Sequence, residues 1–227
     1  MIDARRSFDA DGYVVLAPMV SDLVCDDLLR IVEASAQLRR AGSRRLLDIA
    51  EVADVARALR DDPVLADLLP PAAVAVQCTL FSKDARSNWS VAPHQDLSVP
   101  VSARMDAVGW TGWSRKQQVW FVQPPATILE TLIAVRLQLD PVDASGGPLR
   151  VVPGSHRRGR LTMEALARMA STRMAPCLVE RGGTLVMKPL LVHASGRATA
   201  VSARRVLHFL YGPAQLPDGL RWANAIH

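Results

Sequence analysis

Apolar residues before residue 70 recur every three or four positions, which is typical of amphipathic helices. One such pattern follows Ser21, whose hydroxyl makes it a suitable N-cap, and two more cover 49–60 and 63–69. Pro70–Pro71 ends the last of them, because proline lacks the amide donor that a helix needs. We therefore expect the segment 19–70 to form a helical cover.

After residue 72 the apolar residues gather in short runs that are rich in β-branched side chains and separated by glycine and proline. With one earlier run included, the predicted strands are 13–16, 74–81, 131–139, 148–152, 177–180, 184–187, 190–193 and 205–211. A helix is predicted at 161–170, and Gly182–Gly183 is typical of a tight turn between two strands. Many short strands after a helical segment favour a mainly β fold with a helical cover, namely a double-stranded β-helix (jelly roll, cupin-like). We expect a single domain over 1–227, with the jelly-roll core largely in 72–212.

The segment 101–126 would be unusually long for a loop inside a compact domain. Loops of this length are often lids or binding loops, so we predict a possible lid over these residues. Trp110 and Trp113 lie in it, and each indole combines a large contact area with one donor. We therefore predict that both line a substrate pocket. The alternative is that they only pack a helical cover onto the roll.

Amino-acid composition and charge exclude several classes of protein. The chain of 227 residues is 49% hydrophobic, enough for a sizeable core, and has a net charge of +5. Its basic pairs are scattered without interleaved aromatic residues, so we interpret them as a solvated surface and expect no nucleic-acid partner. Cys25, Cys78 and Cys177 are too few and too far apart to indicate disulfides or a Cys-rich zinc site. Without a signal-peptide pattern or a long apolar run, we expect a cytoplasmic protein with no membrane partner.

A candidate metal site comes from His94 and Asp96 together with the distant His193. In extended backbone, positions i and i+2 point to the same side, so His94 and Asp96 can bind one ion while Gln95 points away. Two imidazoles and one carboxylate form the facial triad of iron(II) oxygenases, which leaves coordination positions open. The spacing alone is close to what chance supplies, and a lone His193 would more often be a hydrogen-bonded core residue.

Four segments in order give the spacing a context: FDADGYVVL, VAPHQDLSV, SGGPLRVVPGSHRRGRL and KPLLVHASGRATAVSARRVLHFLY. Together they resemble the phytanoyl-CoA dioxygenase family of iron(II)/2-oxoglutarate-dependent oxygenases. The resemblance implies that His94, Asp96 and His193 are the metal ligands and that these residues are catalytic. It also implies iron(II), 2-oxoglutarate and O2 as cofactor and co-substrates.

The resemblance extends to residues that bind the co-substrate. Arg204 matches the arginine that pairs with the distal carboxylate of 2-oxoglutarate, a role that suits a planar guanidinium. Arg205 is the neighbouring alternative, since strand alternation lets only one of the two face the site. Ser195 resembles the hydroxyl that assists the same carboxylate. Gln77 corresponds to a position that faces the pocket, and we predict a role in binding co-substrate or substrate, with simple burial as its alternative.

The implied function is that of an iron(II)/2-oxoglutarate-dependent dioxygenase that hydroxylates, or otherwise oxidises, a small-molecule metabolite or biosynthetic intermediate. The intact Asp96 favours hydroxylation, desaturation or ring closure over halogenation, because related halogenating enzymes have a small residue there. His156 in the Pro-Gly-Ser-His turn is interpreted as a structural loop histidine. Two alternatives share the fold: a non-catalytic metal-binding jelly-roll protein, and a cupin-like oxygenase that needs no co-substrate.

Overall fold

The computed structural model describes residues 4–34, 43–83, 88–171, 173–199 and 203–227. Its strands form a five-stranded antiparallel sheet (β1-β10-β7-β12-β2), a four-stranded antiparallel sheet (β3-β11-β8-β9) and a three-stranded antiparallel sheet (β4-β6-β5). The strands are β1 Tyr13–Leu16, β2 Val74–Lys83, β3 Val91–His94, β4 Val99–Val101, β5 Thr111–Lys116, β6 Val119–Gln123, β7 Ile133–Gln138, β8 Leu149–Val151, β9 Ala175–Cys177, β10 Thr184–Met187, β11 His193–Ser195 and β12 Arg204–Gly212.

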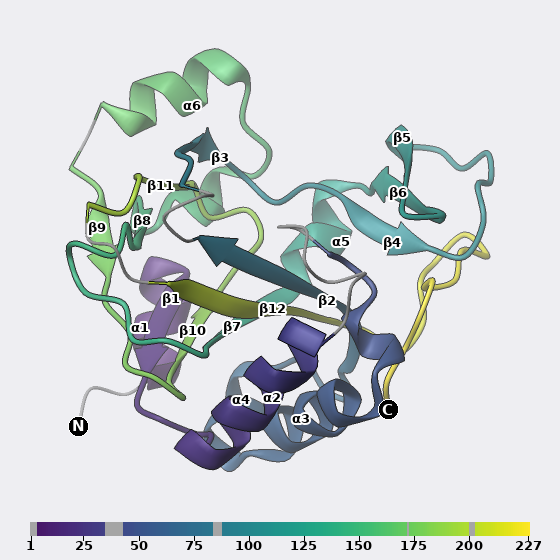
Figure 1. Ribbon diagram of the computed structural model, residues 1–227. Helices are drawn as coiled ribbons and strands as arrows, with labels where there is room; N and C mark the ends of the chain where they lie inside the picture. Colours follow the sequence, from purple (N-terminus) through teal and green to yellow (C-terminus); the bar gives the residue numbers. More distant parts are fainter. Residues whose placement is uncertain (1–3, 35–42, 84–87, 172, 200–202) are drawn as a thin grey trace.

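The helices of the first third cover one face of the five-stranded sheet. In Figure 1, α2, α3 and α4 lie below this sheet, while β3, β11 and α6 lie above it. The helices are α1 Ala4–Asp11, α2 Asp22–Ala34, α3 Ala50–Asp61, α4 Pro63–Leu68, α5 Ala126–Glu130 and α6 Met163–Ala170. Short 3-10 turns occur at Leu46–Asp48 and Ser155–Arg158. The helical cover agrees with the sequence pattern, and α1 is an element that the pattern did not indicate.

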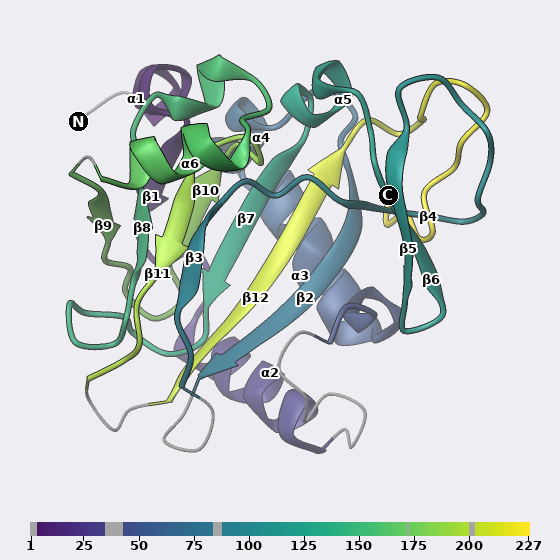
Figure 2. The ribbon, with the colours of Figure 1, turned by 90° about the horizontal axis from the view of Figure 1, so that it is seen from above.

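The central strand β7 shows how the sheet separates core from site. All six of its residues are buried. Ile133, Val135 and Leu137 pack into the hydrophobic cluster between the sheet and the helices. Because side chains alternate along a strand, Arg136 points to the opposite face, where it lines a cavity. One face of the five-stranded sheet is therefore apolar and is covered by helices (Figure 2). The opposite face carries Arg136 into the roll.

Two details differ from the sequence-based expectations. The segment 101–126 contains β5 and β6, and β6 pairs with both β5 and β4 in a small antiparallel sheet at one end of the molecule (Figure 2). The predicted turn at Gly182–Gly183 exists, but β9 and β10 on either side of it belong to different sheets. Gly182 has φ +74°, and a Cβ there would meet the Val20 carbonyl oxygen at 2.1 Å, so only glycine fits. No helix in the described parts of the chain is long and apolar enough to cross a bilayer.

Candidate metal centre and its two cavities

His94, Asp96 and His193 converge where β3 and β11 lie side by side. His193 is paired with His94 in the strand register, and the amide of Asp96 donates to the Pro189 carbonyl at 2.9 Å. The Nε2 atoms of His94 and His193 lie 3.7 Å from the two different carboxylate oxygens of Asp96. One ligand atom from each residue lies within 4.8 Å of the others, so the three side chains could hold one metal ion.

The imidazole rings are oriented by backbone carbonyls. Nδ1 of His94 lies 2.8 Å from the Ala92 oxygen, and Nδ1 of His193 lies 2.9 Å from the Leu191 oxygen. A carbonyl oxygen only accepts, so both Nδ1 atoms carry the proton and both Nε2 lone pairs face Asp96. Burial lowers the pKa of His193 to about 4, which keeps this ring neutral at neutral pH. Neutral imidazoles with free Nε2 atoms are the form that binds iron(II), so the residues present fit this metal.

Gln95 points away from the triad, as the strand spacing predicted. Its Nε2 donates to the carbonyls of Leu190, at 2.6 Å, and Gly159, at 2.8 Å, and its Oε1 accepts from the Leu161 amide at 2.9 Å. These bonds tie the metal-binding segment to the chain before β11 and to the loop that leads into α6. Gln95 is 6% exposed, so its bonds are shielded from water.

Replacing Gln95 by alanine is therefore expected to lower the free energy of unfolding by about 3 kcal/mol, because three backbone groups lose their partner in or near the interior. Urea denaturation of the metal-free protein measures this. Gln215→Ala is the matched control, since Gln215 is exposed and should change stability little. Equal midpoints for the two variants would contradict the structural role of Gln95.

One cavity beside the triad is strongly cationic. His94, Asp96 and His193 line it together with Ser195 and three basic residues, Lys83, Arg136 and Arg204. Among the described residues that line it, Asp96 is the only carboxylate. Nε of Arg136 and Nε of Arg204 are both buried without a hydrogen-bond partner in the described part of the chain. Buried donors of this kind fit an anionic ligand, and 2-oxoglutarate carries two carboxylates.

Arg204 and Arg205 point in opposite directions from β12. Arg204 is 6% exposed, lines the cavity and donates to the Gly147 carbonyl. Burial, with a contribution from Arg136, lowers the pKa of Arg204 to about 10, so the side chain stays charged at neutral pH. Arg205 instead donates to Asp140, at 2.7 and 2.8 Å, and to Glu33 on the outer side. The structure thus places Arg204, and not Arg205, beside the triad.

Lys83 and Arg136 have no assigned role in the sequence analysis. Nζ of Lys83 donates to Ser195 Oγ at 3.1 Å and to the Gly196 carbonyl at 2.8 Å. Burial, with Arg204 and Arg136 nearby, lowers the pKa of Lys83 to about 8.

NH1 of Arg136 lies 2.8 Å from Nδ1 of His208 and donates to it. Burial and Arg136 lower the pKa of His208 to about 3, so this ring is neutral. A charged residue inside the apolar strand 131–139 was the signal available for Arg136.

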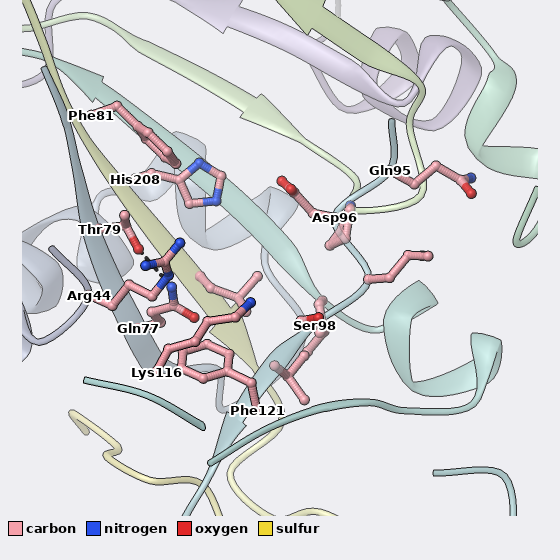
Figure 3. Close-up of a pocket in the computed structure, with 15 residues that line it drawn as sticks. Arg44, Gln77, Thr79, Phe81, Gln95, Asp96, Ser98, Lys116, Phe121 and His208 are labelled. Atoms are coloured by element: carbon pink, nitrogen blue, oxygen red, sulfur yellow. Dashed lines mark hydrogen bonds between the residues drawn. The ribbon is translucent and has the colours of Figure 1, made fainter. Parts of the chain in front are cut away.

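A second cavity of about 240 Å³ adjoins Asp96 (Figure 3). Asp96 and Phe81 line both cavities, so the two cavities adjoin beside the candidate metal centre. Gln77 lines this second cavity and donates to Thr79 Oγ1 at 2.7 Å. It is not among the residues that line the cavity with Arg204, so a role toward substrate fits its position better than one toward co-substrate.

The two tryptophans predicted to line the substrate pocket lie elsewhere. Trp110 is 4% exposed in a hydrophobic cluster, and its Nε1 donates to Asp218 at 3.0 Å. Trp113 packs edge-to-face against Trp120, with ring centroids 6.4 Å apart. Neither indole lines the two cavities beside Asp96 in the described part of the chain. Their role in substrate binding stays a prediction, and the packing alternative matches their position.

Facing antiparallel sheets that present two imidazoles and one carboxylate define the class of jelly-roll, non-haem metal enzymes. A family profile described as phytanoyl-CoA dioxygenase (PhyH) matches residues 8–206, and the chain belongs to this family. The resemblance seen in the sequence is thereby confirmed. The protein is an enzyme of the iron(II)/2-oxoglutarate-dependent dioxygenase class.

Solved structures share the fold at low sequence identity. The chain is similar to the non-heme alpha ketoglutarate dependent carbocyclase SnoK from nogalamycin biosynthesis, with 14% identity, a TM-score of 0.68, and coverage of 100% of this chain and 93% of the other. EctD from S. alaskensis has 18% identity and a TM-score of 0.67, with coverage of 94% and 77%. HygX from Streptomyces hygroscopicus, with nickel and 2-oxoglutarate bound, has 16% identity and a TM-score of 0.65, with coverage of 94% and 87%. The predicted fold class is confirmed. No curated protein gives a significant sequence match.

Proposed function

We propose that this protein couples the conversion of 2-oxoglutarate to succinate and CO2 with the oxidation of a C–H bond in a small molecule, most simply its hydroxylation. Bound iron(II) would supply the dioxygen chemistry, in which one atom of O2 ends in succinate and the other in the hydroxylated product. His94, Asp96 and His193 would hold the metal through the two Nε2 atoms and the carboxylate. The intact carboxylate of Asp96 supports hydroxylation or another hydrogen-abstraction outcome over halogenation.

The observation that carries this proposal is the cationic cavity that the triad lines together with Lys83, Arg136 and Arg204. Asp96 also lines a second cavity, which leaves room for a substrate beside the same centre. In the cationic cavity, Arg204 and Ser195 would bind the distal carboxylate of 2-oxoglutarate. Lys83 donates to Ser195 and adds a further positive charge beside it. Among the described residues that line this cavity, three are basic and Asp96 is the only carboxylate. This excess of positive charge favours an anionic co-substrate over the alternative of a cupin-like oxygenase that needs no co-substrate.

Spectroscopy under anaerobic conditions tests the co-substrate half of the proposal. Iron(II) and 2-oxoglutarate added together to the purified protein should give a weak visible charge-transfer band, because both carbonyl and carboxylate oxygens of the co-substrate approach the metal. Zinc(II) in place of iron(II) should give no band. Absence of the band with iron(II) at neutral pH would overturn the site assignment.

Admission of O2 then separates the enzyme from the non-catalytic alternative. The iron(II) protein with 2-oxoglutarate and ascorbate should release succinate slowly even without substrate, while the zinc(II) protein should release none. A band that forms with iron(II) but is never followed by succinate would favour a metal-binding protein that does not turn over.

A further inference from the structure

The cavity of about 240 Å³ beside Asp96 has a chemical character of its own. It reaches Asp96 at one end and is enclosed by residues of β2, β4, β6 and β12 together with the turn after β3. A cavity of this volume holds a small molecule, or one end of a larger one.

The wall remote from Asp96 carries two cations, Arg44 and Lys116. In Figure 3 both side chains lie on the far side of the cavity from the Asp96 carboxylate, beside Gln77. They come from separate parts of the chain, before β2 and at the end of β5, yet their charges interact electrostatically. Among the described residues that line this cavity, Asp96 is the only carboxylate. Since Asp96 would be committed to the metal, the cations give the far wall a positive potential.

The surroundings of Lys116 show that this charge is partly removed from water. Its side chain is half-buried, and Nζ lies 5.1 Å from the centre of the Phe121 ring. Burial and the neighbouring Arg44 lower the pKa of Lys116, and burial lowers the pKa of Arg44. Both charges are thus partly shielded from water, and a bound anion would interact with them more strongly than with fully exposed charges.

The remaining polar groups of this cavity are neutral. Gln77 and Thr79 are hydrogen-bonded to each other, and Ser98 presents a hydroxyl. His208 accepts a hydrogen bond from Arg136 through Nδ1, which leaves an uncharged ring at the boundary between the two cavities. The cavity thus has an apolar and neutral middle, a metal-binding end and a cationic end.

We propose that the substrate is a small organic anion whose carboxylate or phosphate is bound by Arg44 and Lys116, which directs the opposite end of the molecule toward the metal. This assignment rests on the proposed dioxygenase function, because it needs a metal at Asp96 that oxidises the substrate. The two cations then fix which carbon is oxidised, because the distance from the charged group to the metal end selects the C–H bond that is presented. Gln77 is placed to donate or accept a hydrogen bond along the same molecule.

Calorimetric titration of the anaerobic iron(II)–2-oxoglutarate complex tests this without knowledge of the natural substrate, since the co-substrate already fills the other cationic cavity. The probes are matched pairs that differ in charge: hexanoate and hexanamide, phenylacetate and phenylacetamide, phenyl phosphate and phenol. At least one charged member should bind about tenfold or more tightly than its neutral partner, as expected for charge-assisted hydrogen bonds. The pairs also distinguish a carboxylate from a phosphate.

Two variants and a control locate the effect. Lys116→Met and Arg44→Met should each reduce the preference for the charged member to about threefold or less. Arg115→Met removes the same charge from the neighbouring, exposed position of β5 and should leave the preference unchanged. The proposal is overturned if no charged probe binds better than its neutral partner, or if the preference survives both substitutions.

The visible band separates this proposal from the one on which it rests. A band without any preference for anions would refute the anion site and leave the dioxygenase assignment intact. If the protein formed no band but still preferred anions in a way that depends on Lys116, the dioxygenase assignment would be refuted and the anion site would be kept. Variants that keep the band are folded at the metal centre, so a lost preference in them is not a folding defect.

Discussion

His193→Ala is expected to abolish both stable iron binding and succinate formation. His193 contributes one of three donors and is 3% exposed, with its Nε2 set 3.7 Å from Asp96 by the bond from Nδ1 to the Leu191 carbonyl. Alanine leaves only two metal-binding side chains, so the affinity for iron(II) should fall by more than about a hundredfold. This exceeds the loss of about 10- to 100-fold that follows when a residue hydrogen-bonded to a ligand is replaced. Metal analysis after dialysis and succinate release measure the two effects.

The control for this prediction is another histidine outside the triad. His156 lies in the 3-10 turn Ser155–Arg158, where its ring lies next to Gly12 and is not among the residues of either site cavity. His156→Ala should keep full iron content and the visible band with 2-oxoglutarate. If His193→Ala retained one iron per chain together with the band, the proposed ligand set would be wrong.

The candidate metal ligands could be predicted from sequence because part of their geometry is local. His94 and Asp96 are two positions apart at the end of a strand, and their family context supplied the distant His193. The cavities could not be found in this way, because their walls come from elements that are distant along the chain. Lys83 at the end of β2 pairs in register with Arg204 of β12 and contacts Ser195 of β11, which belongs to another sheet. No local pattern predicts that contact.

The segment 101–126 resembles a loop in sequence for an identifiable reason. β5 and β6 are joined by Gln117–Gln118, and both residues have positive φ, +49° and +66°. Tight hairpin turns of this kind usually contain Asn-Gly or another glycine pair, because other residues are strained there. Two glutamines therefore carry no turn signal, and the hairpin could not be seen in the sequence. With the segment folded largely as a sheet, Trp110 packs in a hydrophobic cluster, and the role of 101–126 as a lid stays a prediction.

Arg204→Met is expected to raise the KM for 2-oxoglutarate by about a hundredfold or more, while succinate formation at saturation falls less. A buried guanidinium that pairs with a carboxylate is lost, and truncating one partner of such a pair costs about 3–5 kcal/mol. Arg204→Lys should fall between methionine and the wild type, since an ammonium keeps the charge but loses the planar pair of donors. Titration of the visible band with 2-oxoglutarate gives the Kd directly.

Arg205→Met is the control for this prediction, because Arg205 points to the opposite face of β12. Arg205 lies next to Arg204 in β12, but its guanidinium pairs with Asp140 and Glu33 on the outer side. Its loss should lower the free energy of unfolding and leave the Kd for 2-oxoglutarate within about twofold of the wild type, because no contact with the cationic cavity changes. If the two variants weakened 2-oxoglutarate equally, the effect would arise from β12 as a whole. If neither weakened it, the anchor would have to be sought in Lys83 or Arg136, the other cations of that cavity.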